Sequence, residues 1–205
     1  MTTISIIGSG NMAAAIGTRA AKHGHTVEIM SRDASKAQAL AARIGNGTTV
    51  GTYGTRPVGD IVIVAILHEH AVEVVEGFGD ALADKILVDI SNPFNADASG
   101  LVTTEGNSVA QQIAAVAPGS ARVVKAFNGL FSGVVAADKP VDVFFAGGDS
   151  ETRELFATFL ESIDIRPRDA GGLEMTWAIE WASIVLMGVA RNGAGFDTAL
   201  AAETI

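Results

Sequence analysis

The chain has 205 residues, 48% of them hydrophobic, a formal net charge of −9 and no cysteine. This length and apolar content suffice for one buried core. The acidic balance argues against a nucleic-acid surface and against adsorption to an anionic membrane, and the lack of cysteine excludes disulfides and thiolate metal sites.

The sequence predicts no targeting or membrane-spanning segment. Its first apolar run, residues 4–7, is short for a signal peptide and follows no basic region. The longest apolar stretch, residues 182–190, is shorter than the roughly 18 residues that cross a bilayer. We therefore expect a soluble cytoplasmic protein.

Strand and helix patterns alternate along most of the chain. Short apolar runs predict strands at residues 4–7, 27–30, 48–53, 61–66, 86–89, 122–126, 141–146 and 165–167. Alanine-rich or amphipathic segments predict helices at residues 11–23, 34–44, 68–82, 108–116 and 150–162. This alternation predicts an α/β protein whose helices cover both faces of a doubly wound parallel sheet.

Two stretches interrupt the alternation. Residues 92–107 are polar and long for a loop in a compact domain, so they either cover a site or are simply mobile. Residues 176–189, with Trp177 and Trp181, predict a helix that is apolar nearly all round. Such a helix must be buried, either against the sheet or against a second copy of the chain.

A glycine-rich turn joins the first predicted strand to the first predicted helix. Residues 8–13, Gly-Ser-Gly-Asn-Met-Ala, fit the dinucleotide-binding pattern G-x-G-x-x-G/A. In that pattern Gly8 permits a tight turn, Gly10 lets the backbone approach a phosphate, and the small Ala13 lets helix and strand touch. The helix then presents unpaired N–H groups to a pyrophosphate.

The end of the second predicted strand indicates which dinucleotide binds. Ser31 follows Gly10 by 21 residues, where an NAD site carries Asp or Glu for the ribose 2′-hydroxyl. Ser31, Arg32 and Lys36 instead offer a hydroxyl and two cations to a 2′-phosphate. Two charge-assisted bonds of roughly 1.5–3 kcal/mol each would favour NADPH by about 10²- to 10⁴-fold. The alternative is that the cations are a solvated helix start, with Asp33 as its cap.

Three other predicted strand ends carry polar residues that should line the nicotinamide half of the cleft. His68 and His70 are acid/base candidates, or they begin a helix that covers the cofactor. A zinc site at residues 68–70 is disfavoured, because the two histidines lack the i, i+4 spacing of a helical metal pair. Lys125 could contact the substrate or donate a proton, or could cap its strand. Ser132 has no evident base and the chain has no G-x-S-x-G motif, which argues against a hydrolase.

Taken together, these segments resemble the F420:NADP oxidoreductases, the NADPH-dependent reductases of the deazaflavin coenzyme F420. The likeness includes the GSGNM turn, the SR-x-x-x-K segment, residues 69–71, 123–124, 146–149 and 169–171. It implies a Rossmann-type NADP-binding domain at residues 1–170 and a C-terminal helical segment at 171–205 that forms the acceptor pocket or a dimer contact. The NADP(H) residues implied are Gly8, Ser9, Gly10, Asn11, Met12, Ser31, Arg32, Lys36, Ile66, Leu67, His68, Val72, Asn92, Pro93 and Ala126.

The resemblance further implies direct hydride transfer between nicotinamide and F420, with no side chain required as acid or base. The chain departs from the family at residues 173–177 and at His68, where archaeal members carry a bulky aromatic. Residues 125–128 are closer to a wider set of bacterial NADP-binding reductases. Reduction of a flavin or of a small imine or carbonyl metabolite, or NADPH sensing without turnover, therefore stay open. The apolar C-terminal helix also predicts a homodimer.

Overall fold

In the computed structural model, which describes residues 1–203, eight strands form one sheet in the order β3-β2-β1-β4-β5-β6-β7-β8. The strands are β1 (Thr3–Ile7), β2 (Thr26–Met30), β3 (Thr49–Val50), β4 (Ile61–Val64), β5 (Ile86–Asp89), β6 (Arg122–Lys125), β7 (Val141–Gly147) and β8 (Ile165–Asp169). The α-helices are α1 (Asn11–Lys22), α2 (Ala34–Ile44), α3 (His68–Phe78), α4 (Val109–Val116), α5 (Ser132–Ala136), α6 (Ser150–Ser162) and α7 (Thr176–Val189). Short helical turns are η1 (Gly79–Leu82), η2 (Leu173–Met175) and η3 (Ala190–Ala194).

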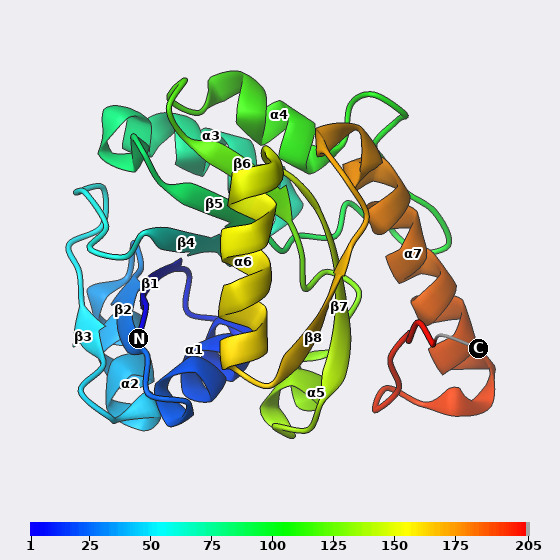
Figure 1. Ribbon diagram of the computed structural model, residues 1–205, viewed down its shortest axis with the longest axis horizontal. Coiled ribbons are helices and arrows are strands. Elements are labelled where there is room, and N and C mark those ends of the chain that lie inside the picture. The colour runs from blue at the N-terminus through cyan, green and yellow to red at the C-terminus, as the bar shows by residue number, and fades with distance from the viewer. Residues whose placement is uncertain (204–205) are drawn as a thin grey trace.

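Helices cover both faces of the sheet (Figure 1), which confirms the predicted Rossmann-type α/β fold. The buried strand β4 shows why the faces separate, because successive side chains of a strand point to opposite sides. Ile61 and Ile63 join the core beneath α1, α2, α5 and α6. Val62 and Val64 join the core beneath α3 and α4.

The sheet contains a reversal that the sequence pattern did not predict. β7 runs antiparallel to β6, with Val124 opposite Gly147 and Lys125 opposite Ala146. The segment between these two strands contains only the short helix α5, which was missed, and an antiparallel neighbour needs no crossover helix. β8 then pairs in parallel with β7.

Local capping explains several element boundaries. The Asp33 carboxylate accepts hydrogen bonds from the backbone N–H groups of Ser35 (3.0 Å) and Lys36 (3.3 Å), which confirms it as the cap of α2. The helix predicted at residues 68–82 ends at Phe78, because Gly79 adopts φ +48° and a 3₁₀ turn follows. The predicted third strand is reduced to two residues, Thr49–Val50.

The helical run Leu173–Ala194 is longer than the apolar stretch 182–190, from which the sequence predicted no membrane-spanning segment; that expectation stays a prediction. The run has 22 residues and a mean hydropathy of 1.3 over its most apolar 18-residue window, so by length and composition alone it could cross a membrane; 33% of that window is buried inside the protein. Within it α7 packs beside β7 (Figure 1). Glu180, midway along α7, is fully buried.

Candidate functional site

The glycine turn between β1 and α1 contains two glycines in different surroundings: Gly8 is packed against the protein, and Gly10 faces open space. Gly8 has φ +131°, and a Cβ at this position would lie 2.3 Å from the Ala65 carbonyl oxygen. Gly10 is the N-cap of α1 with an ordinary φ of −81° and receives no side-chain cap. A Cβ on Gly10 would meet no protein atom within 4 Å. The protein itself therefore does not require glycine at residue 10, whereas a phosphate approaching the start of α1 would.

The carboxyl end of β2 places the predicted 2′-phosphate residues beside this turn. The Ser9 and Ser31 hydroxyl oxygens lie 3.4 Å apart. The Lys36 ammonium is 70% exposed and lies 3.7 Å from the Asp33 carboxylate. Hydrogen bonds from the Ser35 hydroxyl and the Lys36 N–H lower the pKa of Asp33, so this carboxylate partly offsets the positive charge of Lys36. Arg32 is exposed and makes no ion pair within residues 1–203.

These groups surround a cavity of about 290 Å³, whose lining is Gly8, Ser9, Ser31, Arg32, Asp33, Lys36, Tyr53, Ala65, Ile66, Leu67 and His70. The structure thus brings together seven of the residues that the resemblance implies. His70, an acid/base candidate from the sequence, also lines this cavity, whereas Tyr53 was not predicted. Tyr53 packs edge-on against Phe78 with ring centroids 5.0 Å apart, and burial raises its pKa while nearby Arg32 opposes that shift. The position of Tyr53 in the sequence could have indicated its role. Tyr53 follows β3, and β3 is the neighbour of β2 in the sheet.

The loops after β5 and β6 lie together at the same edge. The Asn92 amide donates to the Asn128 carbonyl oxygen at 2.9 Å, and the Asn128 amide donates to the Ile179 carbonyl oxygen of α7 at 3.0 Å. Phe127, which directly precedes Asn128, has φ +60°, a conformation rare for a bulky residue and typical of functional sites. These bonds link the expected nicotinamide region to α7.

Other expected nicotinamide residues differ in accessibility. His68 begins α3 and is half-buried, as is Val72, whereas Pro93 is buried and Ala126 is completely so. Asn11 and Met12 form the first turn of α1.

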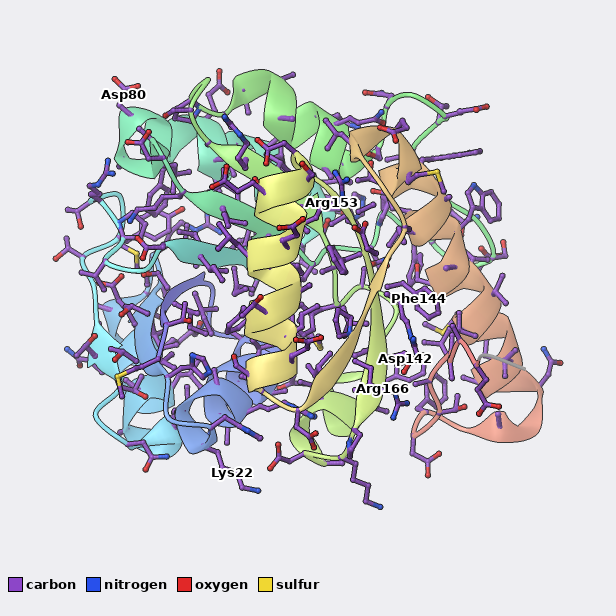
Figure 2. The ribbon with its side chains drawn as sticks, in the orientation of Figure 1. Lys22, Asp80, Asp142, Phe144, Arg153 and Arg166 are labelled. Atoms are coloured by element: carbon purple, nitrogen blue, oxygen red, sulfur yellow. The ribbon has the colours of Figure 1, made fainter. Side chains whose placement is uncertain are left out.

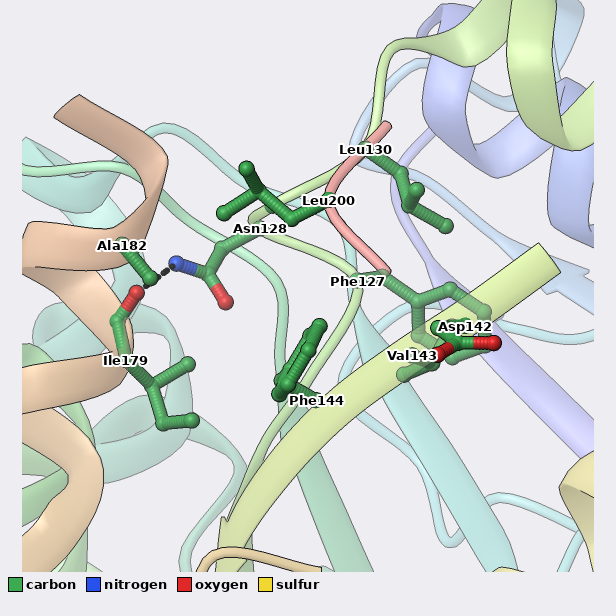
Figure 3. Close-up of a pocket in the computed structure, with 10 residues that line it drawn as sticks. Phe127, Asn128, Leu130, Asp142, Val143, Phe144, Ile179, Ala182 and Leu200 are labelled. Atoms are coloured by element: carbon green, nitrogen blue, oxygen red, sulfur yellow. Dashed lines mark hydrogen bonds between the residues drawn. The ribbon is translucent and has the colours of Figure 1, made fainter. Parts of the chain in front are cut away.

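A slot of about 10 Å³, room for roughly one water molecule, separates α7 from β7. Figure 3 shows the Asn128 amide at its upper side, bonded to Ile179, with Phe144 of β7 opposite. The Asn128 Oδ1 atom is buried and has no partner within residues 1–203. Leu200 of the C-terminal tail also lines the slot.

Lys125 does not face the cleft, which corrects its expected role as a proton donor or substrate contact. Its side chain is 0% exposed, and its Nζ donates to Asp89 Oδ2 (2.7 Å) and to the Ser91 carbonyl oxygen (2.6 Å). Glu180 Oε1 lies 3.3 Å away and is equally buried. The signal for this cluster was present, since Asp89 and Glu180 are single carboxylates within apolar segments and buried charges need partners.

Two further observations delimit the site. A larger cavity of about 550 Å³ lies at the opposite edge, beside Asp60, Ile61, Ile86 and Arg122, where ligands of open α/β sheets do not bind. Within residues 1–203 no group of three His, Asp or Glu side chains is arranged to hold a metal ion.

Comparisons with known proteins agree with this geometry. Residues 3–93 match the family model described as NADP oxidoreductase coenzyme F420-dependent. The chain is 27% identical over 195 residues to the F420-dependent NADP reductase of Methanothermobacter thermautotrophicus, covering 86% of this chain and 84% of that protein. It is 28% identical over 180 residues to the metalloreductase STEAP3 of Rattus norvegicus, covering 86% of this chain but only 35% of the metalloreductase.

Solved structures share the fold. A protein from Arthrobacter sp. FB24 assigned as an F420-dependent NADP reductase has a TM-score of 0.83 at 21% identity, covering 98% of this chain and 100% of that one. An imine reductase from Aspergillus terreus, solved with NADPH4, has a TM-score of 0.66 at 22% identity, covering 95% of this chain and 63% of that one.

The chain is thus similar to NADP-dependent oxidoreductases. Its resemblance to the F420-dependent NADP oxidoreductases, expected from the sequence, is confirmed.

Proposed function

We propose that the chain binds NADPH along the carboxyl ends of β1, β2 and β4 and transfers its hydride to a flat ring acceptor, coenzyme F420. One observation carries the nucleotide assignment: Ser31, Arg32 and Lys36 line the same 290 Å³ cavity as the glycine turn. No carboxylate stands at Ser31 to receive a ribose hydroxyl, and Asp33 is engaged as the cap of α2.

The residues present fit the nucleotide. The open position beside Gly10 would receive the pyrophosphate, and Arg32 and Lys36 would hold the 2′-phosphate. Ile66, Leu67, His68, Val72, Asn92, Pro93 and Ala126 are proposed for the nicotinamide half, the last two only through small local movements because both are buried. When bound, NADPH supplies the hydride; the chain supplies position and orientation.

The C-terminal segment 171–205 is proposed as the wall of the acceptor site. Support comes from the direction of α7, which starts near Arg122 and Asp149 at the amino edge, where Leu173 lines a shared cavity. At Ile179 it meets the Asn128 loop at the carboxyl edge. The helix thereby brings its later turns and the tail to the edge where the nucleotide is proposed to bind.

F420 as the acceptor is supported by the family model and by the archaeal relative. The likeness to an imine reductase favours a second candidate, reduction of a small imine or carbonyl compound. NADPH sensing without turnover is the third.

A deazaflavin absorbance assay distinguishes the three. Purified protein is mixed with NADPH and oxidised F420, and in parallel with NADPH and a panel of cyclic imines and ketones. Bleaching of F420 supports the first proposal. Imine- or ketone-dependent loss of NADPH without bleaching replaces it with the second, and tight NADPH binding without any turnover replaces it with the third.

Two further proposals concern the cellular location and the oligomeric state of the protein. We infer a cytoplasmic homodimer in which α7 packs on its counterpart. The support is an apolar stripe on α7 that is left exposed in the single chain: Trp181 (40% exposed), Val185 (56%) and Val189 (45%), spaced one helical turn apart. An apolar stripe of this kind on a helix is typical of an interaction surface.

A further inference from the structure

Asp89, Lys125 and Glu180 form a buried cluster with two carboxylates and one ammonium. All three side chains are 0% exposed. Asp89 and Lys125 are direct cross-strand partners at the ends of β5 and β6, and Glu180 reaches them from α7. No other cation forms an ion pair with either carboxylate within residues 1–203.

Each carboxylate is surrounded by hydrogen-bond donors. Asp89 accepts from Lys125 Nζ at 2.7 Å and from the Ser91 N–H at 2.9 Å. Glu180 accepts from the Val109 N–H at 2.9 Å and the Thr103 hydroxyl at 2.7 Å. Four groups that can donate hydrogen bonds thus converge on the two carboxylates. One lysine offsets only one of these carboxylates, so the cluster has a formal net charge of −1.

This charge lies next to the two loops that carry Asn92 and Ala126, both proposed for the nicotinamide half. The Ser91 carbonyl that accepts from Lys125 immediately precedes Asn92, and the Ala126 N–H donates to the Asp89 carbonyl at 3.1 Å. Burial reduces screening by water, so the field of the cluster extends to these loops.

We propose that the Asp89–Lys125–Glu180 cluster is a positioning element that also favours the oxidised nucleotide, whose nicotinamide ring is positively charged, over the neutral reduced ring. This inference rests on the proposed function. An unbalanced negative charge near the ring stabilises NADP⁺ relative to NADPH, and so makes the bound nucleotide a stronger hydride donor. Glu180 is the member that adds the extra charge, and it does so from the C-terminal helix.

The test measures the dissociation constants of NADP⁺ and NADPH separately, by calorimetry, for the wild type and for Glu180→Gln. Loss of one negative charge should raise the ratio Kd(NADP⁺)/Kd(NADPH) about three- to tenfold. Asp89→Asn, measured in the same way, should shift the ratio in the same direction. This variant provides the test if Glu180→Gln does not fold. A purely structural role would weaken both nucleotides equally and leave the ratio unchanged.

Two controls separate charge from shape. Glu180→Asp keeps the charge, so the ratio should stay at the wild-type value even if both affinities fall. Glu28→Gln removes another buried carboxylate, which accepts from the Ser5 hydroxyl in the distant β1–β2 pair, and should also keep the ratio. An unchanged ratio in folded, nucleotide-binding Glu180→Gln or Asp89→Asn overturns the inference. Failure of the wild type to bind either nucleotide overturns the proposed function instead, and the inference with it.

Discussion

The Cβ position of Gly8 lies 2.3 Å from the carbonyl oxygen of Ala65. The turn after β1 is therefore pressed against the end of β4, and its first glycine is fixed by packing within the protein. The second glycine, Gly10, faces open space. The two positions of one motif therefore require glycine for different reasons.

This contrast predicts different outcomes for two matched variants. Gly8→Ala should lower the free energy of unfolding by about 2 kcal/mol or more, because the new methyl group meets backbone and φ +131° is strained for alanine. Gly10→Ala should keep the wild-type stability but weaken NADPH binding at least about tenfold. Thermal unfolding and nucleotide titration of both variants check this; wild-type affinity in Gly10→Ala would contradict a pyrophosphate at this turn.

Arg32 and Lys36 should determine the preference for NADPH over NADH. Arg32→Ala and Lys36→Ala should each reduce the ratio of kcat/KM for NADPH to that for NADH by about 10- to 100-fold, since each removes one charge-assisted bond to the 2′-phosphate. The effect of Lys36 should be the smaller, because Asp33 already lies 3.7 Å from its ammonium. Arg43→Ala, which removes an exposed cation from the other end of the same helix, is the control. A preference unchanged by Arg32→Ala would refute the assignment.

Asp142 predicts a pH-dependent contribution to stability. Burial alone would raise the pKa of this carboxyl, but hydrogen bonds from Arg168, the Ala202 N–H and Arg166 lower it to about 2. Figure 2 shows Asp142 and Arg166 together on the paired strands β7 and β8. A lowered folded-state pKa gives stability that is present above the unfolded value near 4 and lost as pH falls through about 2. The contribution at neutral pH is about 2 kcal/mol.

Chemical denaturation at a series of pH values checks this contribution. Between about pH 4 and pH 2 the wild type should lose more stability than Asp142→Asn, which has no titrating group at this position. The two curves should converge at the acid end. Parallel curves over this range would show that Asp142 has an ordinary pKa.

The exposed stripe of α7 predicts the oligomeric state. Light scattering at micromolar concentration should give the mass of a dimer for the wild type and of a monomer for Val185→Asp, because a charge in the contact is desolvated without a partner. Leu155→Asp alters another exposed apolar residue, 56% exposed on α6, and should stay dimeric. A monomeric wild type would contradict the homodimer.

The nucleotide half of the site could be predicted from local sequence. The glycine turn, the cap at Asp33 and the cations of α2 are contiguous features whose geometry follows from strand–turn–helix rules. Tyr53 could not be placed in the same way. Its inclusion depends on which strands are neighbours in the sheet, and the strand order is not encoded in hydrophobic periodicity.

The acceptor half depended on long-range packing and was predicted less well. Lys125 ends a strand, as a cleft-facing lysine would, but its burial is determined by Glu180, 55 residues further along the chain. The antiparallel direction of β7 could not be predicted from local sequence either, because the apolar run at residues 141–146 fits a parallel or an antiparallel strand equally well.

The reversal at β7 has a practical consequence for engineering. Because β7 runs antiparallel to β6, the loop at residues 126–131 follows the end of β6 on the side of the sheet proposed to bind the nucleotide, whereas Asp138 bonds to Lys22 and His23 at the far end of α1. Randomised or lengthened loops at residues 126–131 would reshape acceptor choice, while changes at residues 148–149, where β7 gives way to α6, would fall on the remote side. A library built to alter substrate range can therefore be confined to one short stretch of the gene.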